Sequence, residues 1–232
     1  MNNLGSIIDK IGKHIDEKDQ IREQTLRYSR TIIIHCRKAI HQIHQEQYEQ
    51  AIDLINQAST VHTQLQTATA NHPDIAHAGY VENATQEYVE AQCFYQIMQE
   101  EELPDPDSLN TSYASYIQGL CDVIGELRRK TLDTILEGES QQAHHYLTIM
   151  QELYEAINQF EYPSGLLPIK RKQDIARSLV EKTRGELAVA SSEQRIECRT
   201  DELKGILDNL QSSESKRQLK KSKNELDIDR VW

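Results

Sequence analysis

Three short stretches rich in turn-forming residues divide this chain, and the segments between them are long and rich in helix formers. The stretches are His72-Pro73-Asp74, Leu103 to Ser108, and Tyr162 to Gly165. Proline ends helices because it lacks an amide hydrogen and its ring clashes with the preceding turn. With only 5 prolines and 9 glycines in 232 residues, and without runs of alternating β-branched residues, the sequence predicts an all-α fold.

Apolar residues at helical spacing predict seven helices in the segments between the turns. Their ranges are 4–44, where a break at 15–18 stays open, then 47–69, a third helix that begins at 75 or 79 and ends at 101, and 109–137, 140–160, 168–189 and 191–211. Residues 212–224 are polar and lysine-rich, which predicts a mobile tail. The apolar end at 226–232 is expected to dock on this or a neighbouring subunit. We therefore expect one helical domain at 1–191 and a C-terminal helical extension with a charged tail at 192–232.

The overall charge limits the classes of partner. A net charge of −11 and a pI near 5.3 argue against adhesion to nucleic acid or anionic membrane through the overall field. The longest apolar run, Leu187 to Ala190, is far too short to span a membrane. Four cysteines stand singly without metal-binding spacing, which favours buried free thiols in a reducing compartment. We expect a cytoplasmic protein that does not enter membranes.

Two carboxylates in the segment 79–98 lie where carboxylates are costly. On a helical wheel, Glu87 and Glu90 fall on the side that carries Phe94 and reads as core. The opposite face, expected to meet water, carries the uncharged polar residues Thr85, Gln92 and Gln96. A buried ionised carboxylate costs several kcal/mol unless it is paired, protonated or bound to metal. The pair therefore predicts a nearby cation.

Asp122 and Glu126 are a second acidic pair, four residues apart and so on one side of the helix predicted at 109–137. One interpretation is a wet surface on which Glu126 pairs with Arg129 or Lys130. The other depends on the short preceding turn, which makes this helix the antiparallel neighbour of the one bearing Glu87 and Glu90. In that case the four carboxylates converge.

Basic residues gather in two stretches despite the negative total. The first helix carries Arg22, Arg27, Arg30, Arg37 and Lys38, and the later stripe begins with Lys170, Arg171 and Lys172. Either these residues face nucleic-acid phosphates, or they form solvated helix faces paired with acids elsewhere in the fold. His41 and His44 have metal-ligand chemistry but lack a third ligand at helical spacing.

Four blocks in order carry a resemblance to a known family. They are IREQTLRYSRTIIIHCRKAI at 21–40, QEYVEA at 86–91, YIQGLCDVIGELRRKTLDTILEGE at 116–139, and LPIKRKQDIARSLVEKTRGELAVA at 167–190. Together they resemble the translin family, most closely its archaeal members and translin-associated factor X. Residues beyond Ser191 have no counterpart in this resemblance.

The resemblance implies an all-α fold of about seven helices that assembles into a hollow octamer and binds single-stranded RNA or DNA. Catalytic members cleave RNA with a metal ion, and their acidic motifs match Glu87, Glu90, Asp122 and Glu126 here; Arg22 matches a basic position used for nucleic acid. Four carboxylates suit Mg²⁺ or Mn²⁺. We therefore expect a metal-dependent endoribonuclease. The alternatives are a non-catalytic shell that binds single strands, and a helical scaffold that touches no nucleic acid.

Overall fold

The chain folds entirely into helices in the computed structural model, which describes residues 3–228. In chain order they are α1 (Leu4–His44), α2 (Tyr48–Thr69), α3 (Pro73–Ala76), α4 (Gly79–Met98), α5 (Tyr113–Leu136), α6 (Ser140–Asn158) and α7 (Lys170–Ile228). The predicted all-α class is confirmed. The first helix runs without a break through residues 15–18.

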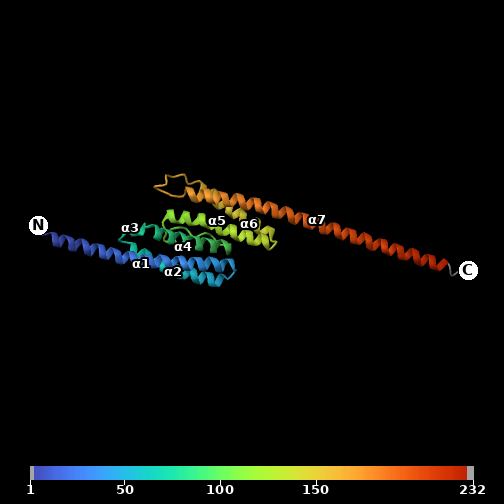
Figure 1. The fold of residues 1–232 in the computed structure, drawn as a ribbon, viewed down its shortest axis with the longest axis horizontal. Helices are drawn as coiled ribbons and strands as arrows, with labels where there is room; N and C mark the ends of the chain where they lie inside the picture. Colours follow the sequence, from blue (N-terminus) through green and yellow to red (C-terminus); the bar gives the residue numbers. More distant parts are fainter. Residues whose placement is uncertain (1–2, 229–232) are drawn as a thin grey trace. The chain divides into compact units, whose positions relative to one another are not determined.

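The helices before residue 185 pack as successive antiparallel neighbours (Figure 1). A turn at residues 45–47 folds α2 back along α1, with Glu46 in the left-handed region at φ 59°. α4 then packs against α1, α2 and α5, and α5 packs against α6. The core side chains are fully buried aliphatic and aromatic residues, such as Ile32 of α1, Phe94 of α4 and Leu127 of α5. This arrangement puts α4 at the centre of the bundle.

The central position of α4 overturns one expectation from the helical wheel. Thr85, expected to meet water, is only 4% exposed, and Gln92 and Gln96 are half-buried. Helices cover α4 on more than one side, so its polar face is partly shielded from solvent. The Thr85 hydroxyl donates to the Val81 carbonyl at 3.0 Å, and Gln92 donates to the Tyr88 hydroxyl. Local hydrogen bonds therefore offset the burial of Thr85 and Gln92, whereas Gln96 Oε1 is buried without a partner among the described residues.

The start of α5 also differs from the prediction. The helix begins at Tyr113 instead of near residue 109. The Asp105 carboxylate accepts the amides of Asp107 and Ser108, each at 2.9 Å, and holds these residues in a turn. Ser112 then caps the helix by accepting the Ser115 amide at 3.0 Å. The turn at Asp105 and the cap at Ser112 therefore set where α5 begins.

The structure continues α7 as one helix of 59 residues, so the predicted break near residue 190 and the separate helix at 191–211 are wrong. The helix also runs through the segment predicted to be a mobile tail. Two units are distinguished, with the boundary between Arg184 and Gly185. The domain limit at residue 191 stays a prediction, and the expected docking of 226–232 falls largely outside the described residues.

Two further expectations concern the cysteines and membranes. Cys36, Cys93 and Cys121 are buried free thiols as predicted, whereas Cys198 is exposed. Among residues 3–228, no helix combines the length and apolar character needed to cross a membrane.

Candidate carboxylate site

Glu90 of α4 is the centre of the candidate site. Burial raises its pKa to about 9, and the charges of Asp122, Glu126 and Glu87 add to the shift while Lys172 opposes it. Its carboxylate has no hydrogen bond or ion pair within the described part of the chain. The four predicted carboxylates therefore lie near enough to act on one another, and Glu90 lacks a cationic partner of its own.

Asp122 of α5 is held by Lys172 of α7. The Lys172 Nζ donates to Asp122 Oδ2 at 2.5 Å, to Gln86 Oε1 at 3.0 Å and to the Gln118 carbonyl at 3.1 Å. Burial raises the Asp122 pKa, and the hydrogen bond from Lys172 works against this effect. One ammonium group thus joins three helices at the acidic cluster.

Glu87 of α4 is paired with Arg37 of α1. The Arg37 Nη2 donates to Oε1 at 2.8 Å and its Nε donates to Oε2 at 3.3 Å. This two-bond geometry suits a planar guanidinium and a carboxylate. The Glu87 side chain is 17% exposed while that of Arg37 is 67% exposed, so Arg37 covers the carboxylate from the solvent side.

Glu126 of α5 pairs with neither Arg129 nor Lys130, the two partners considered from the sequence. Its Oε2 lies 2.6 Å from Nε2 of His44, whose side chain is only 1% exposed. Lys130 instead donates to Glu46 at 2.8 Å. Arg129 makes no hydrogen bond or ion pair with any described residue. The interpretation of Glu126 as half of a wet surface pair is therefore wrong.

Three of the carboxylates open onto a cleft of about 320 Å³ between α1, α4 and α5. Its lining combines acidic and basic groups: Arg37, Ile40, His41, Glu87, Glu90, Glu126 and Arg129. Arg37 and His41 are one helical turn apart on α1, and Glu126 and Arg129 are one turn apart on α5. The cleft thus has acidic side chains inside and basic side chains on two of its helices.

Within residues 3–228, no three His, Cys, Asp or Glu side chains are already arranged to hold a metal ion. Ion pairs engage Glu87 and Asp122, and Glu126 lies within hydrogen-bond distance of His44. The donor chemistry nevertheless fits Mg²⁺ or Mn²⁺, because the cluster supplies only oxygen donors. Glu90 is the side chain that would gain most from such an ion, since its half-buried carboxylate makes no ion pair with any described residue.

A comparison with protein families identifies the chain. The model of the translin family matches residues 20–185, and these residues include the whole carboxylate cluster. The chain belongs to the translin family. The chain is 34% identical over 176 residues to the protein MJ0175 of Methanocaldococcus jannaschii. The match covers 75% of this chain and 78% of that protein.

Solved structures share this translin fold. AfC3PO superposes with a TM-score of 0.74 and 29% identity, covering 80% of this chain and 97% of that one. AfC3PO in complex with duplex RNA gives a TM-score of 0.73 and 27% identity over the same shares. Apo-NeC3PO, at 20% identity and a TM-score of 0.68, shares the fold.

The basic residues predicted to bind nucleic acid separate into exposed and engaged groups in this translin-family chain. Arg27, Arg30, Lys38, Lys170 and Arg171 are exposed. Arg22 is also exposed but lies 3.2 Å from Asp19. Arg37 and Lys172 are engaged with carboxylates of the cluster. The structure therefore brings two of the eight residues to the acidic site and leaves the others on helix surfaces.

Sequence reasoning missed His44 as a member of the site and considered Arg129 only as a surface partner. The available signal was the spacing of Arg37, His41 and His44, which puts all three on one face of α1. Only the packing of α1 against α4 shows that this face meets the carboxylates. His44 also stacks against Phe94, with ring centroids 5.1 Å apart.

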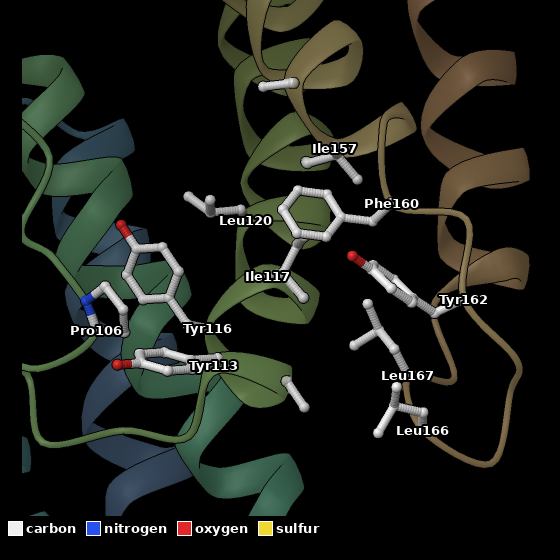
Figure 2. A pocket seen from close by; sticks show the side chains of 12 residues that line it. Pro106, Tyr113, Tyr116, Ile117, Leu120, Ile157, Phe160, Tyr162, Leu166 and Leu167 are labelled. Atoms are coloured by element: carbon white, nitrogen blue, oxygen red, sulfur yellow. The ribbon is translucent and has the colours of Figure 1, made fainter.

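A larger cavity of about 640 Å³ elsewhere has different chemistry (Figure 2). Aromatic and aliphatic side chains line it, including Tyr116, Leu120, Phe160, Tyr162 and Leu167. None of the four clustered carboxylates belongs to its lining. It suits apolar contacts and not metal or phosphate, so it is separate from the candidate site.

Proposed function

We propose that this chain is a metal-dependent endoribonuclease that cleaves single-stranded RNA inside an oligomeric shell. The observation that carries the proposal is Glu90, a half-buried carboxylate that makes no ion pair with any described residue and lies beside Glu87, Asp122 and Glu126. Membership of the translin family supports nucleic-acid binding and assembly, and AfC3PO has been solved with duplex RNA. The octamer and the preference for single strands are parts of this proposal.

Mg²⁺ or Mn²⁺ is the proposed cofactor, held by Glu87, Glu90 and Asp122, with Glu126 as a further ligand or a base. Such an ion would offset charge on the phosphate and make a bound water a better nucleophile. In the metal-free chain Arg37 neutralises Glu87 and Lys172 neutralises Asp122. Those two contacts hold the Glu87 and Asp122 carboxylates in place at the cluster.

Glu126 is the candidate to accept a proton from water. Its contact with buried His44 fixes one carboxylate oxygen, and the side chain lies in the lining of the cleft. The exposed residues Arg22, Arg27, Arg30, Lys38, Lys170 and Arg171, with Arg37 at the cleft, would hold the strand by its phosphates. An enclosed shell would admit single strands more readily than long duplexes.

A specific observation favours a second candidate, a shell that binds RNA without cutting it. Two of the four carboxylates are in ion pairs and a third contacts His44, and no ready-made metal site occurs among the described residues. In this alternative the acids only hold helices together. Binding would then continue in the presence of a chelator, and no metal would produce cleavage.

Cleavage of a labelled single-stranded RNA with Mg²⁺, Mn²⁺ or EDTA decides between the two candidates, with a duplex of the same sequence run in parallel. Glu90→Gln keeps the shape of the side chain but cannot ionise to bind a metal ion, so it should abolish metal-dependent cleavage and leave RNA binding intact. Glu82→Gln is the matched control, because Glu82 lies on the same helix and its closest cationic partner is His77 at 3.8 Å.

The proposal holds if the Glu82→Gln protein cleaves like wild type and the Glu90→Gln protein binds without cleaving. Wild-type protein that binds RNA and leaves it whole under both metals supports the binding shell instead. Light scattering on each protein shows that the variants assemble as wild type does.

A further inference from the structure

We infer that Arg129 and His41 form a subsite for one phosphate of the RNA backbone, facing the carboxylates across the cleft. The inference rests on the proposed function and adds to it the residues that would place the scissile linkage. It concerns two side chains that sequence analysis did not assign to nucleic acid.

Arg129 is the first reason for this inference. It lies on α5 one turn after Glu126 and lines the cleft with Glu87, Glu90 and Glu126. An arginine three residues from a glutamate ordinarily pairs with it. Here His44 holds Glu126 at 2.6 Å, and Arg129 has no partner among the described residues. The guanidinium is therefore available to an external anion.

His41 is the second reason. It is exposed and lines the same cleft from α1, and its side chain makes no hydrogen bond with any other described residue. Its neighbours on that face are both engaged, Arg37 with Glu87 and His44 with Glu126. The α1 wall and the α5 wall thus each supply one unengaged nitrogen-bearing side chain.

The chemistry of the cleft points to a phosphodiester as the anion. A phosphate that approaches Glu87, Glu90 and Glu126 meets like charge, so a cation must offset that repulsion before the linkage can lie near the carboxylates. Guanidinium presents paired donors that match phosphate oxygens. A carboxylate ligand could also accept hydrogen bonds from these donors. It lacks the repeated negative charges of a nucleic-acid backbone, which the exposed basic residues along α1 would bind.

RNA binding in EDTA tests the subsite without relying on cleavage. Fluorescence anisotropy of a short labelled single strand gives Kd at salt concentrations from about 50 to 200 mM. Arg129→Ala should weaken binding about tenfold, as for a lost charge-assisted hydrogen bond. It should also reduce the salt slope by about 0.7, the amount for one phosphate contact on a single strand. His41→Ala should weaken binding by a smaller factor.

Two further variants sharpen the test. Arg129→Lys keeps the charge without the planar donors, so it should preserve the salt slope and give an intermediate Kd. Arg195→Ala removes the same charge from an exposed site whose side chain bonds to Ser192, and it should bind RNA as wild type does. Arg129 is exposed and unpaired, so its replacement is not expected to disturb folding.

The inference is overturned if Arg129→Ala binds with wild-type affinity and salt slope, or if Arg195→Ala loses as much affinity as Arg129→Ala. In both cases, metal-dependent cleavage by the wild-type protein would still support the proposed nuclease function. Failure of the wild-type protein to bind any RNA would overturn the subsite and the proposed function together.

Discussion

Gly119 of α5 lies so close to Val89 of α4 that a β-carbon at residue 119 would be 2.8 Å from the Val89 Cβ. The same β-carbon would be 2.9 Å from the carbonyl oxygen of Gln86. Backbone oxygen and a β-branched stem cannot move aside cheaply. The contact is one residue from Glu90 and three from Asp122, so it sets the spacing of the two helices that carry the carboxylates.

Gly119→Ala should lower the free energy of unfolding by about 1–3 kcal/mol, because the extra methyl group overpacks the contact between α4 and α5. Gly125→Ala on the same helix is the matched control, since a β-carbon there meets nothing within 4 Å. It should raise stability by about 0.5–1 kcal/mol through helix propensity. Urea denaturation measures both, and equal effects from the two changes would contradict the close approach.

Glu90 should make metal-free protein progressively less stable as the pH rises from about 4.5 to about 9. The folded-state pKa of Glu90 is raised from 4.5 to about 9, so the unfolded chain releases this proton first and unfolding is favoured progressively between those values. Glu90→Gln has no proton to release and should flatten the decline. Melting temperatures in EDTA at pH 6.5 and 8.5 test this, and parallel declines in both proteins would assign the effect to other groups.

His62 should make the protein less stable as the pH falls below about 6.5. Burial lowers its pKa from 6.5 to about 4, and its ring stacks on Tyr88 with centroids 4.6 Å apart. The unfolded chain takes up this proton first as the pH falls, so stability is lost from pH 6.5 down to pH 4. His62→Phe should remove that loss. The stability difference between variant and wild type at pH 6.5 and 4.5 isolates His62, and a constant difference would refute its role.

Lys172→Met should lower the free energy of unfolding in EDTA by about 1–3 kcal/mol, because Asp122 loses its partner and two other acceptors lose their donor. If Asp122 is a metal ligand, Mg²⁺ should raise the melting temperature of this variant more than that of wild type. Lys170→Met is the control, since Lys170 is exposed and lies 4.0 Å from Asp174. Equal Mg²⁺ effects in all three proteins would exclude Asp122 as a ligand.

Local patterns were enough to predict much of the fold. The ends of α2 and α6 fall within two residues of the predicted ones, because apolar stripes and turn residues mark them clearly. The start of α5 lies later than predicted because the Asp105 side chain holds a turn before it. The spacing of apolar residues does not reveal such a side-chain effect. The continuity of α7 through residue 190 was missed because serine and alanine there neither favour a break nor prevent a helix.

The sequence predicted which acidic residues would lie together, but it did not predict which residues would pair with them. Glu90 and Asp122 come together because α4 and α5 pack against each other as expected, although the connection at residues 99–112 is longer than the turn that the sequence indicates. The pairing of Glu126 with His44 joins residues 82 positions apart, and depends on how α1 packs into the bundle. Sequence spacing on α5 pointed to Arg129 instead. Tertiary packing therefore decided which basic group remained unengaged.

Arg37 and Lys172 give the cluster counterions from the chain itself, and His44 gives Glu126 a hydrogen-bond partner, which bears on when a metal ion could be needed. A zinc finger cannot fold until its metal arrives, because only the ion holds its ligands together. Here side-chain contacts between helices hold three of the carboxylates in place without a metal ion. If the site takes up a divalent ion as proposed, folding would not depend on that ion, and chelation would remove activity without unfolding the chain.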